Sequence, residues 1–173
     1  LLTLARSLSD GSIRLVFSVR GNREQELRAA ISSDYANVSF APFASEDSLE
    51  RRLAAADIQV VSLREEWTGT VVPSKFFGAI AIGRPVIFAG SHDSAIARWI
   101  EQYNLGWVLN AETVQKVADD LRIIAGNPAA LTELGEHCRR VYQDVFSRER
   151  VISQWDRLLR SLFDTTPQDT WRK

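Results

Sequence analysis

Apolar positions in the first 110 residues form short runs, separated by stretches in which apolar residues recur at helical spacing. The short runs predict five strands: Ile13–Val19, Val38–Phe40, Ile58–Leu63, Arg84–Phe88 and Gly106–Leu109. The stretches between them predict four helices. Three of these span Arg23–Ile31, Ser74–Ile82 and Asp93–Tyr103. The fourth begins after Ser45, which caps it, and carries Leu49, Leu53 and Ala56 on its apolar face. Strands that alternate with helices of about ten residues indicate a parallel sheet with right-handed crossovers and helices on both faces. We expect the strand at 58–63 to be covered on both faces, because only Gln59 interrupts its apolar run.

The last third of the chain has a different pattern, which predicts three consecutive helices. They span Val114–Ala125, Pro128–Phe146 and Arg148–Phe163. The third carries a wide apolar stripe that includes Trp155. The predicted fold is therefore a doubly wound, Rossmann-like α/β domain over residues 1–163 with extra C-terminal helices, followed by a polar tail at 164–173.

The chain opens in an apolar-periodic helix that no strand precedes. Leu1, Leu4, Ala5 and Leu8 lie on its apolar face. A doubly wound sheet normally begins with a strand, so we expect the first strand of this sheet to lie upstream of Leu1. The chain also contains no Met, which favours a segment of a larger protein.

Composition excludes several classes of protein. The 21 Lys and Arg residues against 22 Asp and Glu leave a net charge of −1, which argues against a nucleic-acid binder. The single Cys138 cannot form an internal disulfide, and no Cys/His cluster has the spacing of metal ligands. No stretch approaches 18 apolar residues and no signal peptide is recognisable, so we expect a cytoplasmic protein.

In open parallel sheets, ligands bind outside the carboxyl ends of the strands. Four connections lie there: Ser18–Asn22, Ala41–Ser45, Arg64–Ser74 and Ala89–Asp93. The third leads into a helix, whose first N–H groups suit a phosphate or diphosphate, and Lys75 adds a positive charge. Glu65 and Glu66 could accept hydrogen bonds from sugar hydroxyls. In the alternative interpretation, Ser74 only caps the helix, and Lys75 and the glutamates lie in solvent.

Other candidate residues carry a weaker signal. Gly21 follows a strand, but the chain has neither Gly-x-Gly-x-x-Gly nor Gly-Lys-Ser/Thr. Arg20 is suited to an anion or to a surface salt bridge. His92 is suited to acid–base chemistry, or it is a solvated side chain beside an N-capping Asp93. His137 and Cys138 fall inside a predicted helix, away from the strand ends, so a catalytic dyad is the less favoured interpretation.

Two segments resemble a known family. They are Ala56–Leu63 (ADIQVVSL) and Val72–Ile87 (VPSKFFGAIAIGRPVI), with weaker support from Arg20–Leu27 and Asn37–Phe40. The chain resembles the C-terminal, donor-binding domain of GT-B glycosyltransferases of the retaining group 1 family. Within that family it is similar to a branch with Pro-Ser-Lys before the helix, which acts in capsule, O-antigen and exopolysaccharide synthesis.

The resemblance implies a nucleoside-diphosphate sugar as donor and transfer with retention at the anomeric carbon. The base would lie near Phe40–Pro42 and the diphosphate near Gly69–Ser74. The implied donor-binding residues are Arg20, Gly21, Phe40, Ala41, Glu66, Thr68, Gly69, Thr70, Ser74, Lys75 and Gly78. No metal or cofactor is expected, because fixed positive groups and helix dipoles stabilise the departing diphosphate in this family.

The sequence departs from the family pattern at two glutamates that the family separates by seven intervening residues. Their positions fall at Gly78 and Thr70, neither of which is acidic. The acceptor-binding N-terminal domain and the usual phosphate-binding Arg and Lys should precede Leu1. The final helix should cross onto that domain, which leaves the Trp155 stripe partly exposed here. Peripheral membrane association, if any, would occur through that other half.

Two further functions remain open. A sugar epimerase of the same architecture would need an acid–base pair, for which the strand ends offer His92, Asp93, Glu65 and Glu66. A non-catalytic α/β interaction domain would instead dock a partner on its C-terminal helices. Calorimetry with several nucleoside diphosphates separates these functions, because a docking domain binds none of them.

Overall fold

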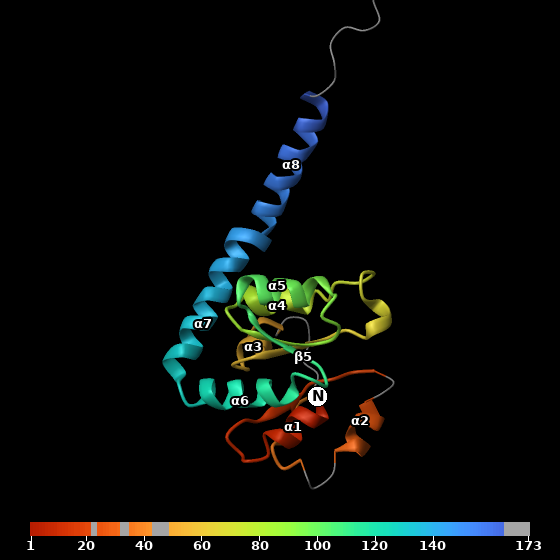
Figure 1. The fold of residues 1–173 in the computed structure, drawn as a ribbon, viewed down its shortest axis with the longest axis vertical. Coiled ribbons are helices and arrows are strands. Elements are labelled where there is room, and N and C mark those ends of the chain that lie inside the picture. Colours follow the sequence, from red (N-terminus) through yellow and green to blue (C-terminus); the bar gives the residue numbers. More distant parts are fainter. Residues whose placement is uncertain (22–23, 32–34, 43–48, 165–173) are drawn as a thin grey trace, which may run out of the picture.

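The computed structural model describes residues 1–21, 24–31, 35–42 and 49–164, and all structural statements refer to these (Figure 1). The capping role predicted for Ser45 lies outside them, as does the predicted tail at 164–173 except Asp164, which ends a helix. Helix α1 (Leu2–Ser7) leads to strand β1 (Leu15–Phe17), helix α2 (Glu24–Ala30) and strand β2 (Val38–Phe40). Leu4, Ala5 and Leu8 are buried. The apolar-periodic opening helix is thus confirmed.

The second part of the α/β unit follows in the same alternating order. Its elements are α3 (Leu49–Ala54), β3 (Gln59–Ser62), the 3-10 helix η2 (Glu65–Trp67), α4 (Lys75–Ala81), β4 (Val86–Ala89), α5 (Ala95–Tyr103) and β5 (Gly106–Leu109). All strand pairs are parallel, β1 with β2 and β3 with β4 with β5. The α/β class with parallel strands is therefore confirmed.

The strands form two sheets, of order β1-β2 and β3-β4-β5, rather than one continuous sheet. The strand predicted at 58–63 is present as β3, which is an edge strand. Its predicted cover on both faces is wrong, because Val60 and Ser62 are exposed. Val60 is 41% exposed, whereas Val86, Ile87 and Phe88 of the central strand β4 are buried. The apolar run alone could not distinguish an edge strand from a central one.

Two apolar clusters cover the two faces of the three-stranded sheet. On one face, Phe88 and Val61 pack with Phe76 and Ile80 of α4 and with Ile96 of α5. On the other face, the following residues pack together: Leu4 and Leu8 of α1, Ile87, Leu109, and Val117 and Leu121 of α6 (Val114–Ala125). Figure 1 shows α4 and α5 on one side of the strands and α6 on the other. Each fully buried large side chain contributes about 1.5–3 kcal/mol to folding.

The C-terminal third consists of helices, as predicted, with one irregularity. Helix α7 (Pro128–Val141) ends in a π-helical turn, η3 (Tyr142–Phe146), inside the predicted single helix. Helix α8 (Arg148–Asp164) then extends away from the body of the protein (Figure 1). Its apolar stripe is exposed, and Trp155 is 60% accessible. The exposure expected for this stripe is therefore confirmed.

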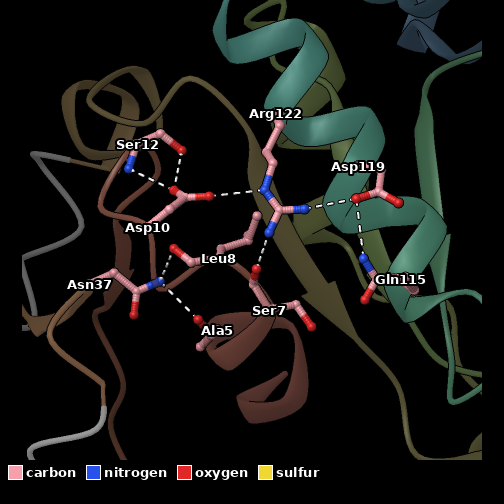
Figure 2. A network of polar contacts seen from close by, with 9 residues as sticks. All are labelled: Ala5, Ser7, Leu8, Asp10, Ser12, Asn37, Gln115, Asp119 and Arg122. Carbon is pink, nitrogen blue, oxygen red and sulfur yellow. Dashed lines mark hydrogen bonds and ion pairs between the residues drawn. The ribbon is translucent and has the colours of Figure 1, made fainter.

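A polar network holds the C-terminal end of α1 in place (Figure 2). The guanidinium of Arg122 on α6 donates to Ser7 O, to Asp10 Oδ2 at 2.9 Å and to Asp119 Oδ1 at 2.8 Å. Asn37, which directly precedes β2, donates from Nδ2 to Ala5 O and Leu8 O, both at 2.9 Å. The last carbonyls of a helix lack intrahelical partners. Side chains from α6 and from the start of β2 supply these partners.

The same network lowers the pKa of the Asp10 carboxyl to about 2. The largest cause is the hydrogen bond from the Ser12 hydroxyl, at 2.6 Å, followed by the bond from the Ser12 amide and that from Arg122. Each of these donors stabilises the charged carboxylate.

Candidate functional site

The structure places the predicted site residues in two groups, at the carboxyl ends of the two separate sheets. Arg20 and Gly21 follow β1 and are exposed. Gly21 has φ +144°, and a Cβ added to it would meet no atom within 4 Å. The backbone there is thus open to a ligand and adopts a conformation that favours glycine.

Phe40 and Ala41 end β2, beside β1. The Ala41 amide donates to Phe17 O at 2.9 Å, which continues the ladder by one residue. The Phe40 ring lies 5.9 Å from that of Phe17, and the guanidinium carbon of Arg28 lies 4.1 Å from the Phe40 ring centroid. A cation at this distance interacts favourably with the π face. Arg28 therefore occupies one face of the ring that the resemblance assigns to the nucleotide base.

The connection after β3 begins with the 3-10 turn of η2. Glu66 forms an ion pair with Arg64, with 3.5 Å between Nη1 and Oε1, and both side chains are well exposed. Such a surface pair contributes about 0–1 kcal/mol, so it holds the carboxylate only weakly. The Thr68 amide donates to Glu65 O, and the amides of Thr70 and Val71 donate to Trp67 O. These three amides are thus already used within the connection.

The connection ends where α4 begins. Ser74 is the N-cap residue, but its hydroxyl makes no capping hydrogen bond. The alternative interpretation is thus wrong on the capping hydrogen bond of Ser74, but right that Lys75, Glu65 and Glu66 are exposed. The amides of Phe76 and Phe77 donate to Pro73 O and Ser74 O, whereas those of Ser74 and Lys75 make no hydrogen bond to another described residue. Ser74 and Lys75 are exposed, so both residues at the start of α4 are accessible to a ligand.

The two positions that correspond to the family's glutamates are Thr70, which is exposed, and Gly78, which is half-buried. A Cβ added to Gly78 would lie 3.4 Å from Leu53 Cδ1 of α3. A side chain at residue 78 would therefore lie in contact with Leu53. Gly78 of α4, which stands where the family has a carboxylate, thus packs close to Leu53 of α3.

Sequence reasoning missed a cavity at the carboxyl ends of β4 and β5. It has a volume of about 350 Å³ and is lined by Leu1, Thr3, Ala89, Leu109, Asn110, Ala111 and Val114. The connection after β5 was not among the four considered from the sequence. Inclusion of every strand end would have found Asn110, whereas the contribution of Leu1 depends on the packing of α1.

The other candidates do not form a catalytic arrangement. Nδ1 of His92 lies 3.2 Å from Oε1 of Glu101, and Ser94, not Asp93, caps α5 by accepting from the Ala97 amide. The capping role expected for Asp93 is therefore wrong, because Ser94 has the extended backbone of an N-cap.

Cys138 and His137 lie within α7, as expected from the sequence. Burial raises the pKa of the Cys138 thiol to about 12, which disfavours the reactive thiolate. His137 Nε2 is bonded to Tyr103 O at 2.7 Å. These two residues therefore have structural roles.

The described residues contain neither a membrane-spanning helix nor a cluster of metal ligands. In that part of the chain, no helix is long and apolar enough to cross a bilayer. Within the same residues, no three His, Cys, Asp or Glu side chains gather in a way that could hold a metal ion.

Comparison with known proteins identifies the family. No relative is found among curated proteins. The family model described as "Glycosyl transferases group 1" matches residues 2–127, a range that contains every strand and every strand-end connection described above. Membership implies a role in glycosyl transfer from a donor to an acceptor. The chain therefore belongs to the group 1 glycosyl transferases.

Proposed function

We propose that this chain is the donor-binding part of a retaining glycosyltransferase and holds the diphosphate of a nucleoside-diphosphate sugar where the Arg64–Ser74 connection enters α4. The observation that carries the proposal is the pair of amides at Ser74 and Lys75, which make no hydrogen bond to another described residue, beside the exposed Lys75 side chain. Backbone amides without an internal partner and a neighbouring ammonium group favour the binding of a phosphate. The family match over residues 2–127 supports the same reaction class.

In this proposal, the chain contributes electrostatic stabilisation of the departing nucleoside diphosphate. The donor is a substrate, and no resident cofactor or metal is assigned. The other proposed donor contacts are Arg20, Gly21, Phe40, Ala41, Glu66, Thr68, Gly69, Thr70 and Gly78. We assign the acceptor site to a separate N-terminal domain, so the donor-binding domain at 1–163 has no transfer activity alone. The proposed pathway is bacterial surface polysaccharide synthesis in the cytoplasm.

Calorimetry with UDP, GDP, ADP and dTDP tests the proposal. We expect at least one nucleotide to bind and Lys75→Ala to weaken that binding by about tenfold to a hundredfold, because a hydrogen bond to a charged group contributes about 1.5–3 kcal/mol. Arg140→Ala is the control, since it removes one exposed positive charge on α7, where Arg140 Nη1 lies 4.0 Å from Glu136 Oε2. Equal affinity of Lys75→Ala and the parent chain would remove Lys75 from the site. No heat with any nucleotide would refute donor binding.

A non-catalytic docking function is a second candidate, favoured by the exposed apolar face of α8. The stripe residues with large exposed areas are Val151, Ile152, Trp155, Leu158, Leu159, Leu162 and Phe163. A contiguous exposed apolar surface of this kind commonly marks a protein interface. The same calorimetry distinguishes the two functions, because a docking domain gives no heat with nucleotides.

A further inference from the structure

We propose that α8 pairs antiparallel with α8 of a second copy of this chain, so that the protein is a two-fold symmetric dimer. This inference does not depend on the proposed function. It rests on the isolation of α8, on the spacing of its apolar side chains, on the hollow beside its first turns, and on the charges that border the apolar stripe.

Helix α8 stands apart from the rest of the protein. The extended backbone of Ser147 separates it from the π-helical turn η3, and it then extends away from the body (Figure 1). Every residue from 151 to 163 is exposed. Most of the stability of a helix in a protein comes from the packing of its apolar face, and an isolated helix of this length is marginal in water. A partner that covers the stripe therefore also stabilises α8 itself.

The apolar side chains have the spacing that pairs two helices. Val151, Trp155, Leu158 and Leu162 follow one another at intervals of four, three and four positions, which is the spacing of the core positions in a coiled coil. Antiparallel pairing about the midpoint of these four residues places Val151 opposite Leu162 of the second copy. The same pairing places Trp155 opposite Leu158. Each helix then contributes a large apolar side chain to every layer of the pair.

An open apolar hollow extends the stripe onto the body of the protein. It has a volume of about 400 Å³ and is lined by Phe77, Trp99, Val145, Phe146, Val151 and Gln154. Val151 belongs to both the hollow and the stripe. In the antiparallel pair, Leu162 of the second copy therefore reaches the edge of the hollow, and the end of each α8 packs against the body of the other copy.

The exposed stripe is close to the size that a stable dimer needs. Its seven large side chains are 39–77% exposed, which corresponds to roughly 500–700 Å² of apolar surface per copy. The hollow adds further area. A specific interface buries about 800 Å² per partner, so the stripe and the hollow together approach this size.

The polar side chains that border the stripe favour a second copy over an anionic membrane. The residues along one border are Glu149, Asp156 and Arg160, and those along the other are Gln154 and Ser161. A two-fold axis brings each border against the same border of the second copy. Arg160 of one copy then lies between the levels of Glu149 and Asp156 of the other, whereas the second border carries no charge. Acidic residues beside the stripe are unfavourable at an anionic lipid surface.

Sedimentation equilibrium of the chain tests the inference. We expect a dimer with a dissociation constant in the micromolar range or lower. Trp155→Glu places a charge in the middle of the interface and should raise this constant on the order of a hundredfold, because buried aromatic residues contribute most to binding. Ile123→Glu is the matched control, since it puts the same charge in place of an exposed apolar residue on α6. Both side chains are exposed in the single chain, so both variants should fold, which circular dichroism checks.

Disulfide cross-linking tests the antiparallel register. The double variant Val151→Cys with Leu162→Cys should form a covalent dimer on mild oxidation, because these two positions lie opposite each other in the pair. Val151→Cys alone should form no covalent dimer, because positions 151 of the two copies are about 16 Å apart along the helix axis. The native Cys138 is buried and does not compete.

Four outcomes would overturn the inference. The first is a monomer at every concentration into the hundred-micromolar range, because another domain or protein is then left to cover the stripe. The second is equal association of Trp155→Glu and Ile123→Glu, because another surface then forms the dimer. The third is cross-linking of Val151→Cys alone, because the helices are then parallel. The fourth is a monomer that binds phosphatidylglycerol vesicles and loses this binding in Trp155→Glu, because a membrane then covers the stripe.

Discussion

Asn37→Ala tests how strongly the hydrogen bonds from Asn37 to the last turn of α1 stabilise the protein. Asn37 is only 6% exposed, and its Nδ2 donates to Ala5 O and Leu8 O at 2.9 Å. The substitution removes both donors from the last turn of α1. Because α1 packs on α6 and on the three-stranded sheet, its release also weakens the contact between the two halves of the fold.

The size of the destabilisation depends on which hydrogen-bond donors remain for Ala5 O and Leu8 O in the variant. Ala5 O still accepts from the Leu8 amide at 3.2 Å, so it loses only the net value of a hydrogen bond, about 0.5–1.5 kcal/mol. Leu8 O loses its side-chain donor, and a buried carbonyl without a partner costs about 1–3 kcal/mol. The Oδ1 atom of Asn37 is itself buried without a hydrogen-bond partner, so its removal offsets part of the loss. We expect a net destabilisation of about 2–3 kcal/mol.

Thermal unfolding followed by circular dichroism measures this effect. For a chain of this size, about 2–4 °C of Tm is lost per kcal/mol, so the expected decrease is about 4–12 °C. Gln115→Ala is the control, because Gln115 lies on the exposed side of the network, where its Nε2 donates to Asp119 at 3.2 Å. Its removal should cost less than about 0.5 kcal/mol. A Tm of Asn37→Ala within 1 °C of the parent chain, or equal losses in both variants, would refute this reasoning.

Three further predictions concern other parts of the fold. Gly106→Ala should lower Tm by roughly 6 °C or more, because the new Cβ would lie 2.0 Å from Val86 O and Gly106 has φ +140°. Gly126→Ala is the control: its Cβ would make only ordinary contacts, so Tm should be nearly unchanged. The pKa of the Asp10 carboxyl is lowered in the folded chain, so the ionised carboxylate stabilises the fold above pH ~4, and this stabilisation is lost as pH falls toward 2. Asp10→Asn should remove this part of the pH dependence of Tm. A curve of Tm against pH that is the same in Asp10→Asn and the parent chain would contradict the prediction. Because burial raises the pKa of the Cys138 thiol to about 12, alkylation of the native chain at pH 8 should be far slower than in denaturant, and equal rates would show that the thiol is accessible.

Element boundaries could be predicted from sequence where the end signals are local. The observed bounds Gly106–Leu109 and Val114–Ala125 coincide with the predicted ones. Helix α7 begins after Asn127, whose side chain accepts from the Ala130 amide, with Pro128 in the first turn. Asp93 and Ser94 are adjacent residues that both suit the N-cap of α5. The extended backbone of Ser94, which only the structure shows, makes Ser94 the cap.

The candidate site was only partly predictable. The connections after β1, β2 and β3 lie at the strand ends as expected. Their availability to a ligand depends on contacts that no spacing reveals, such as Arg28 over the Phe40 ring and the Thr70 and Val71 amides bonded to Trp67 O. The cavity beside Asn110 requires Leu1 and Leu109, which are 108 positions apart in the chain, to come together.

The sequence by itself determined which segments are strands and helices, that the strands are parallel, and that residues 2–127 belong to the group 1 glycosyl transferases. These properties depend on periodicity, turn residues and local motifs, which act over a few neighbouring positions. Only the tertiary structure decided that β3 is an edge strand, that the strands divide into two sheets, and that Asn37 and Arg122 hold the end of α1. The hydrophobic effect has no direction, so an apolar side chain does not specify which neighbour covers it. Burial of side chains and pairing of strand edges are therefore decided only when distant segments pack together.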